Sequence, residues 1–221
     1  MSDPSGLITI SDPTSPVAEA YRTLRMNMQF AALDKALRSV LITSPGSGEG
    51  KSTTLANLAV TMGQVDRSVV MVDSDLRRPH LHELFRLHNE TGLTTMMLDD
   101  AALASPPLQE TTVPGLRLLA SGTLPPRPAD LLGSQRMDKV IEALLSDADI
   151  LLFDAPPVMA ATDAVVLSTK MDGVLLVVSA GETKREAAQQ ALERLNKVNA
   201  NVLGAVLANA QVSAAMGGYY R

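Results

Sequence analysis

Short apolar runs alternate with longer helical patterns along most of the chain. Each run is rich in valine, leucine and isoleucine and is bounded by polar residues, glycine or proline, which is typical of strands buried on both faces. Strands that alternate with helices at this spacing indicate a mostly parallel sheet with helices on both sides. We therefore expect an α/β, three-layer sandwich with strands at about residues 39–43, 68–72, 116–119, 150–153, 173–178 and 202–208.

The segments between the strands predict helices. One begins at about residue 16, because Ser15 can cap it and Pro16 suits a first turn, where a missing N–H costs nothing. The stretch 101–115 is rich in proline, serine and threonine, so we expect an irregular connection there. Further helices are predicted at about residues 51–64, 80–87, 128–145, 163–170 and 184–198.

These elements are expected to form one domain over residues 15–210. A chain of 221 residues is a common size for a single α/β domain. Residues 1–14, rich in serine, proline and aspartate, are expected to form an extended or mobile leader. Residues 211–221 are expected to form a flexible tail, which holds Tyr219 and Tyr220.

The charge and composition exclude several classes of function. With 24 acidic against 19 basic side chains, the net charge is −5, which argues against broad binding to nucleic acid or anionic lipid. There is no cysteine, so disulfides and thiolate metal sites are excluded. The N-terminus lacks the pattern of a signal peptide. The uncharged stretch 198–220 is interrupted by polar residues and paired glycines, so we expect a buried strand and a mobile tail rather than a membrane span.

The stretch from Ser39 to Thr54, SVLITSPGSGEGKSTT, has the layout of a phosphate-binding loop. Glycines let successive N–H groups converge on an anion, and the N-terminus of the following helix adds its positive end to the same spot. Lys51 would reach the β- and γ-phosphates, and the Ser52 hydroxyl would bind Mg²⁺. The expected nucleotide-binding residues in this loop are Gly46, Ser47, Gly48, Glu49, Gly50, Lys51, Ser52 and Thr53.

The match to the standard phosphate loop has one flaw. Pro45 stands where the pattern requires glycine, and Gly46 is displaced by one position. A simple glycine-rich turn between a strand and a helix is the alternative. The order of strand, loop, Lys-Ser pair and helix favours the phosphate loop.

Acidic residues follow two of the expected strands. Asp73 and Asp75 end the strand at 68–72, and both project to the same side because strand side chains alternate. Asp154 ends the strand at 150–153, where a carboxylate typically holds the Mg²⁺ shell. Ligands bind at this edge of an open parallel sheet. Of Asp73 and Asp75, one would bind the metal and the other handle a proton; a turn or capping role for both is the alternative.

A charged band lies on the helix that begins at residue 16. Glu19, Arg22 and Arg25 are three residues apart, so they share one side of that helix. From the spacing alone, a solvated charged face is the simpler interpretation.

With these residues placed, the sequence resembles the bacterial tyrosine kinases (BY-kinases) of polysaccharide export and synthesis over nearly its whole length. The family's Walker A, Walker A′ and Walker B motifs look like SPGSGEGKST, VVMVDSDLRRP and ILLFDAPP. Its Glu-x-x-Arg-x-x-Arg motif is matched by Glu19, Arg22 and Arg25, its proline-rich segment by PPRPADLL, and its Thr-Asp-Ala motif by residues 162–164.

The resemblance implies a P-loop NTPase fold and an ATP-dependent tyrosine autokinase. MgATP would lie on the loop, with Lys51 neutralising the phosphates. Ser52 and Asp75 would hold Mg²⁺, and Asp154 would orient its water shell. Asp73 is the candidate to accept the proton of the tyrosine hydroxyl. Phosphoryl transfer demands little beyond such positioning and charge stabilisation.

The phosphate acceptors would be Tyr219 and Tyr220, presented by a neighbouring subunit, because a mobile terminus can reach another chain's site. Contacts to the nucleotide base are poorly specified by motif, and Asn209 after the last strand is a guess for this role. By resemblance, Glu19, Arg22 and Arg25 would make the contacts of a ring-shaped homo-oligomer, an octamer in the family.

The resemblance also implies partners and a location. We expect a membrane adaptor or activator, protein tyrosine substrates, a cognate phosphatase and no nucleic acid. The chain would act in the cytoplasm, at the inner face of the cell membrane through its partner, and would regulate the synthesis and export of exopolysaccharide or capsule. No membrane-spanning adaptor segment is fused to it, so we expect either a stand-alone kinase or an excised kinase domain.

A different class of protein is the main alternative. Cell-division and plasmid-partition ATPases use the same kind of sheet to hydrolyse ATP and to switch between monomer and dimer. They carry an additional lysine five residues before the invariant one, and that position is Gly46 here. A non-catalytic nucleotide-binding regulator is a third possibility, although every expected catalytic group is present.

Overall fold

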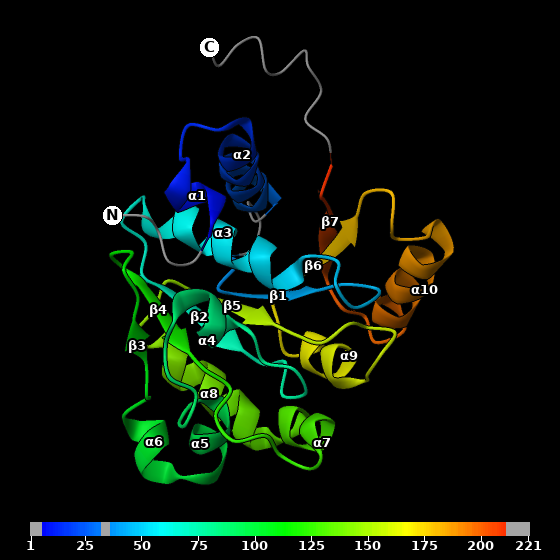
Figure 1. Cartoon of the computed structure of the whole chain (residues 1–221). Coiled ribbons are helices and arrows are strands. Elements are labelled where there is room, and N and C mark those ends of the chain that lie inside the picture. The colour runs from blue at the N-terminus through cyan, green and yellow to red at the C-terminus, as the bar shows by residue number, and fades with distance from the viewer. Residues whose placement is uncertain (1–5, 32–35, 211–221) are drawn as a thin grey trace.

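The computed structural model describes residues 6–31 and 36–210, and one seven-stranded sheet forms the centre of this part (Figure 1). The strands are β1 (Ser39–Thr43), β2 (Val69–Asp73), β3 (Gln109–Glu110), β4 (Leu116–Leu119), β5 (Ile150–Asp154), β6 (Gly173–Ser179) and β7 (Val202–Ala208). Their order in the sheet is β3-β4-β2-β5-β1-β6-β7. Neighbouring strands are parallel except β3 and β4, which are antiparallel.

Helices cover both faces of the sheet, so the expected three-layer α/β sandwich is confirmed (Figure 1). One face carries α1 (Ile8–Ser11), α2 (Pro16–Ala31), α3 (Lys51–Gly63) and α4 (Leu81–Phe85). The opposite face carries α5 (Leu93–Leu98), α6 (Asp100–Ala104), α7 (Pro128–Gly133), α8 (Gln135–Leu145), α9 (Asp163–Ser168) and α10 (Arg185–Asn196).

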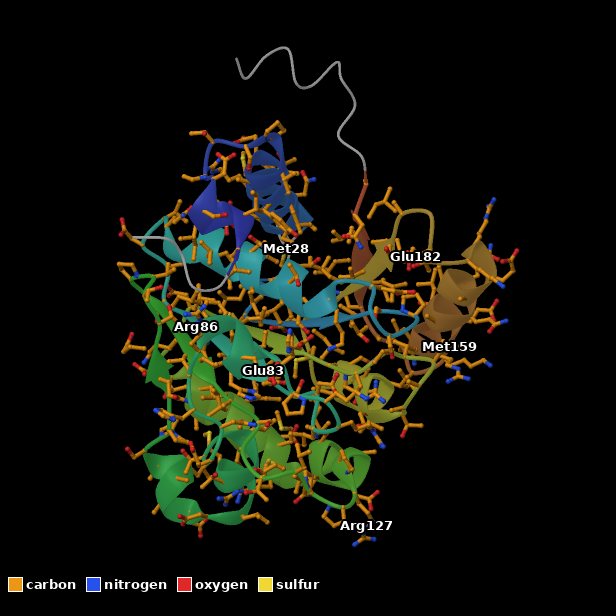
Figure 2. All side chains as sticks on the ribbon, viewed as in Figure 1. Met28, Glu83, Arg86, Arg127, Met159 and Glu182 are labelled. Carbon is orange, nitrogen blue, oxygen red and sulfur yellow. The ribbon has the colours of Figure 1, made fainter. Side chains whose placement is uncertain are left out.

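Two apolar clusters form the core, one on each face of the sheet. Leu41 of β1 and Leu151 of β5 belong to the cluster under α8, whereas their neighbours Val40 and Leu152 belong to the cluster under α3. Met28 of α2 joins the second cluster and lies between α2 and α3 (Figure 2). Because each central strand is buried on both faces, its middle positions are all apolar instead of alternating.

The expectation of an extended or mobile leader is wrong for residues 7–11. Ile8–Ser11 forms α1, and Leu7 beside it is only 1% exposed. The backbone N–H and the hydroxyl of Thr9 donate hydrogen bonds to Oδ1 of Asn57 on α3, at 3.1 and 2.9 Å. Burial of Leu7 and these two bonds fix the segment against α3.

The helix expected at 128–145 is two helices, α7 and α8. The chain is extended at Ser134 (φ −72°, ψ 160°), between Gly133 and the start of α8. A Cβ at Gly133 would lie 2.9 Å from Val166 of α9, so α7 packs close to α9 at this point. Glycine also weakens a helix, and the break occurs where close packing requires it. Arg127, just before α7, points away from the molecule (Figure 2).

The stretch 101–115 is also more regular than expected. It includes most of α6 and the short strand β3, which pairs antiparallel with β4 at one edge of the sheet. The proline- and serine-rich composition favoured an irregular connection, but pairing with β4 and packing of Ala102 and Leu103 against the core give it structure. The sheet therefore has one strand more than the six expected in the described residues.

The parallel strands bring their carboxyl ends to one edge of the sheet. There β2 and β5 are in register, with Asp73 opposite Asp154. Strand β1, which leads into the phosphate loop, is the other neighbour of β5. The glycine-rich loop and the acidic residues thus meet at one place. Within residues 6–31 and 36–210, no helix has both the length and the apolarity needed to cross a membrane.

Candidate active site

The phosphate loop joins β1 to α3 in a turn that depends on two glycines. Gly48 (φ 80°) and Gly50 (φ 85°) adopt the left-handed conformation, which other residues rarely tolerate. Gly50 directly precedes α3, so the unpaired amides of the first helical turn face the loop. The carbonyl of Ser44 accepts a hydrogen bond from the amide of Val158 at 2.8 Å, which ties the loop to the segment after β5. This backbone is suited to binding an anion.

A cavity of about 500 Å³ opens beside the loop, a volume within the usual range for small-molecule sites. Its other walls come from Asp75, Arg77, Arg78 and His80 after β2, and from Pro156, Pro157 and Ala160 after β5. Of the expected nucleotide-binding residues, the following line the cavity: Ser47, Gly48, Gly50, Lys51, Ser52 and Thr53.

The ammonium group of Lys51 lies between two carboxylates. Its Nζ is 3.0 Å from Oδ2 of Asp75 and 3.1 Å from Oδ1 of Asp154. Burial alone would lower the pKa of Lys51, but the attraction of Asp154 and Asp75 and the hydrogen bonds to them outweigh burial and raise it. Lys51 is therefore charged and ready to neutralise an anion that enters the cavity.

Asp154 is fully buried beneath the loop. Its Oδ2 accepts a hydrogen bond from the Ser52 hydroxyl at 2.5 Å, while Oδ1 faces Lys51. Burial raises the pKa of the Asp154 carboxyl, although Lys51 and Ser52 favour its charged form. Ser52 and Lys51 therefore fix the orientation of this buried carboxylate, and a further cation nearby would stabilise its charged form.

Asp73 has one satisfied and one unsatisfied carboxylate oxygen. Its Oδ2 accepts hydrogen bonds from the amides of His80 and Leu81, both at 2.9 Å. Its Oδ1 is buried and has no hydrogen-bond partner. Burial first, and then the nearby charge of Asp154, raise the pKa of Asp73 to about 8. An orphaned buried acceptor is costly, and such groups concentrate at functional sites.

Asp75 is oriented by the chain that follows it. Its Oδ1 accepts hydrogen bonds from the amides of Arg77 and Arg78, at 3.3 and 3.0 Å. Its Oδ2 faces Lys51, on the side of the cavity. The carboxylate therefore presents one fixed oxygen to the site.

These residues fit a hard divalent cation such as Mg²⁺. The available donors are carboxylate and hydroxyl oxygens, contributed by Asp75, Asp154 and Ser52. In the part of the chain that the structure describes, no group of three or more histidine, aspartate or glutamate side chains is arranged to hold a metal alone. Mg²⁺ is usually bound through one or two carboxylates together with phosphates and water. Two carboxylates beside a phosphate loop suit that mode of binding.

Three expected nucleotide-binding residues do not line the cavity. Glu49 turns away from it, and its Oε1 accepts a hydrogen bond from Thr183 at 2.8 Å. A Cβ at Gly46 would lie 3.2 Å from that Oε1, so the Glu49 side chain fills the space beside Gly46. The side-chain amide of Asn209 donates a hydrogen bond to the Ser179 hydroxyl at 2.9 Å. Backbone contacts of Gly46 and Glu49, and a base contact of Asn209, stay predictions.

Sequence reasoning gave no role to an ion pair that borders the site. Arg77 lines the cavity, and its guanidinium donates two hydrogen bonds to the buried carboxylate of Asp163. Asp163 is part of the Thr-Asp-Ala motif, and Arg77 follows Asp75 by two positions. Each residue thus lies in a recognisable motif, but nothing in the sequence indicates that the two side chains meet.

The predicted oligomer residues make contacts within the chain. Arg22 forms an ion pair with Glu19 at 2.7 Å, and both side chains are partly exposed. Arg25 donates to the carbonyl of Thr61 on α3, and its Nε is buried without a partner. Their role between subunits stays a prediction. The predicted acceptors Tyr219 and Tyr220 lie outside the described residues.

Comparisons with known proteins agree with this arrangement. A ParA-type family model, described as NUBPL iron-transfer P-loop NTPase, matches residues 35–216. Tyrosine-protein kinase YwqD of Bacillus subtilis (strain 168) is 40% identical over 207 residues, which are 94% of this chain and 87% of that protein.

Two solved structures match closely. The chimerical protein CapA2B2 has a TM-score of 0.89 and 34% identity, over 94% of this chain and 91% of that one. The kinase domain of Escherichia coli tyrosine kinase ETK has a TM-score of 0.87 and 28% identity, over 94% and 81%. These matches do not favour the partition or cell-division ATPase that was the alternative. The chain has the ParA-type P-loop NTPase fold and belongs to the bacterial tyrosine-protein kinases.

Proposed function

We propose that this kinase uses MgATP to phosphorylate tyrosines in its own C-terminal tail, with the tail of one copy entering the site of another. The observation that supports it most is Asp73. Its buried, unpartnered Oδ1 lies at the same sheet edge as Lys51 and Asp154. A group that handles the proton of the acceptor serves phosphoryl transfer to water or to a tyrosine hydroxyl alike, and the similarity to tyrosine-protein kinases favours the tyrosine.

The phosphate loop performs the binding step. Its amides and Lys51 neutralise the β- and γ-phosphates of ATP, which draws Lys51 away from Asp75 and Asp154. Ser52 and Asp75 would then hold Mg²⁺, with Asp154 in its water shell. When bound there, Mg²⁺ would supply positive charge that stabilises the phosphate oxygens during transfer.

Asp73 performs the proton step. The tyrosine oxygen forms a bond to the γ-phosphorus as the bond from that phosphorus to the bridging oxygen of ADP breaks. Asp73 takes the proton that the phenol loses. With a pKa of about 8, Asp73 keeps its proton in the free protein at neutral pH, so it must release that proton before it acts as the base, and a cation bound nearby would favour this release. Positioning and electrostatics supply the rest.

Mass spectrometry of the intact chain after incubation with MgATP tests this proposal. We expect the addition of one or two phosphates, mapped to Tyr219 and Tyr220, and none in a variant with Tyr219→Phe and Tyr220→Phe. If wild-type protein hydrolyses ATP but stays unphosphorylated, the autokinase proposal is wrong and a pure ATPase is favoured. Mixing a Lys51→Met chain with wild-type chain tests transfer between copies, because the inactive chain should gain phosphate only in the mixture.

We also propose that Glu19, Arg22 and Arg25 lie at subunit contacts of a ring, by resemblance to the family motif. Arg25 already binds α3 within the chain, so the sharper variant changes only Glu19 and Arg22 to alanine. Light scattering should then show monomers that melt at the wild-type temperature. Unchanged oligomer mass would exclude the ring contact. Phosphate on the tail adds about −1.5 to −2 charges per tyrosine, so we expect phosphorylation to favour disassembly.

Membership of the kinase family supports a cellular role in regulating the synthesis and export of exopolysaccharide or capsule. In this proposal the chain works at the inner face of the cell membrane through a membrane adaptor, and a phosphatase resets its tail. Loss of membrane association after deletion of the adaptor would support this location, and unchanged association would contradict it.

A further inference from the structure

The ion pair between Arg77 and Asp163 joins the two segments that border the cavity. Nε of Arg77 is 2.8 Å from Oδ2 of Asp163, and the terminal Nη2 is 2.9 Å from Oδ1, so the pair is bidentate. The Asp163 side chain is fully buried at the first turn of α9, while the Arg77 side chain is 48% exposed. The two residues are 86 positions apart in sequence. A flat guanidinium that spans both oxygens fixes direction as well as distance.

Arg77 belongs to a loop whose backbone orients both acids of β2. In residues 74–81, the amides of Arg77 and Arg78 bind Oδ1 of Asp75, and the amides at positions 80 and 81 bind Oδ2 of Asp73. The loop begins at Ser74, whose amide and hydroxyl donate to the carbonyl of Asp154 at 3.0 and 2.6 Å. The direction of each carboxylate therefore depends on the path of this loop.

The middle of the loop lies at the surface. Arg77, Arg78 and His80 are exposed, in contrast to the buried strand before them. In this exposed part, the Arg77 side chain joins the loop to the buried carboxylate of Asp163 at the start of α9. Leu76 anchors the loop in the core, but the amides of Arg77 and Arg78 that hold Asp75 lie in its exposed part.

We propose that Arg77 is a positioning residue: its bidentate pair with Asp163 holds residues 74–81 so that Asp75 presents Oδ2 to a divalent cation. The inference rests on the proposed function only for the presence of that cation site. It gives a chemical reason for an arginine two positions after Asp75 and for an aspartate at the start of α9.

The test measures Mg²⁺ dependence of nucleotide binding, without any phosphoryl transfer. A fluorescent ADP analogue is titrated onto the protein in EDTA, and the complex is then titrated with Mg²⁺. In Asp163→Asn and Arg77→Ala, the apparent affinity for Mg²⁺ should fall about 10-fold, as is usual for groups that orient a metal ligand. In Asp163→Asn, which leaves the Arg77 charge in the cavity wall, binding in EDTA should stay at the wild-type level. Arg77→Lys should be intermediate, because one ammonium cannot span both oxygens.

The chain offers a matched control at the other end of α9. Lys170 binds both oxygens of Asp138 at 2.7 and 2.8 Å, away from the cavity, so Lys170→Ala removes a bidentate pair near the same helix. It should leave the Mg²⁺ dependence unchanged. A variant with both Asp163→Asn and Arg77→Ala should lose no more Mg²⁺ affinity than either change alone, because the two residues act as one unit.

Two results would overturn the proposal. One is an unchanged Mg²⁺ affinity in the Arg77 and Asp163 variants. The other is an equal loss of binding in EDTA and in Mg²⁺, which would indicate a structural role. If Asp163→Asn or Arg77→Ala does not fold, Arg77→Lys, which keeps the charge, decides between these outcomes. Normal Mg²⁺-dependent binding with no phosphate on the tail would instead contradict the proposed function and leave this inference standing.

Discussion

Carboxylates lie at both edges of the sheet, but their surroundings differ. At the amino edge, Asp172 accepts hydrogen bonds from the amides of Arg38 and Ser39 and from the Ser39 hydroxyl, at 3.1, 3.0 and 3.0 Å. Asp149 accepts one from the amide of Ser68 at 2.9 Å. These carboxylates satisfy backbone groups where β1 and β2 begin, and they lie before β5 and β6.

At the carboxyl edge, three carboxylates crowd around one ammonium. Asp75 and Asp154 both face Lys51, and Asp73 lies in register with Asp154. Oδ1 of Asp73 has no partner, although it is buried. Buried charge that is not fully compensated costs stability. The comparison teaches that the amino edge is complete as it stands, whereas the carboxyl edge is arranged for positive charge and phosphate that bind from outside.

The largest expected effect comes from removing the positive charge at the carboxyl edge. Lys51→Met should reduce phosphorylation of the tail by about 1,000-fold, because it removes the cation that meets the transferred phosphate. MgATP binding, measured by calorimetry, should weaken strongly. Full phosphorylation in this variant would show that the loop is not where ATP reacts.

The next effect separates binding from transfer. Asp73→Asn keeps the shape but removes the group that can accept a proton, so transfer should fall about 100-fold with nucleotide binding nearly unchanged. The measurements are the single-turnover rate of tail phosphorylation and the affinity for MgADP. Loss of both together would indicate that Asp73 holds the metal.

The raised pKa values at the carboxyl edge should make the free energy of unfolding depend on pH. The pKa of Asp73 is raised by burial and by Asp154 to about 8, from 3.8. Between those values the native state keeps a proton that the unfolded state has released, so the free energy of unfolding should fall as pH rises from about 4 to about 8. The raised pKa of Asp154 acts in the same direction.

Urea unfolding of the nucleotide-free protein checks this slope. The Asp73→Asn variant should lose part of the pH dependence, because its amide does not titrate. An identical slope in wild type and variant would contradict the raised pKa of Asp73.

The smallest effect is expected at the amino edge. Asp172→Ala removes the acceptor of three hydrogen bonds and should lower the free energy of unfolding by about 1 to 3 kcal/mol. The rate of tail phosphorylation below the melting transition should not change. A large loss of rate with unchanged stability would mean that the two edges are not functionally distinct.

Sequence patterns were sufficient for the main features of the carboxyl edge. Parallel strands must end together, so acids at the ends of the second and fourth expected strands were bound to approach the phosphate loop. Motif spacing then placed Lys51 at the start of a helix. These features depend on local sequence and on one topological rule.

Features that depend on distant packing were not predictable in this way. The Arg77–Asp163 pair spans 86 positions, and the Glu49–Thr183 hydrogen bond spans 134. The break after Gly133 follows from close packing against Val166 on another helix. Residues 7–11 are held in place by burial of Leu7 and by bonds to Asn57, although the stretch 1–14 around them is rich in serine, proline and aspartate. In each case a tertiary contact overrides the local pattern.

A crystal structure with Mg²⁺ and a non-hydrolysable ATP analogue would show how the carboxyl edge binds its ligands. The account predicts that the phosphates lie on the amides of residues 48–52, with Lys51 turned from the acids onto them. It also predicts Mg²⁺ on Ser52 and Asp75, and Oδ1 of Asp73 facing the γ-phosphate. A nucleotide bound elsewhere, or an Asp73 side chain that still has no access to the γ-phosphate, would contradict it.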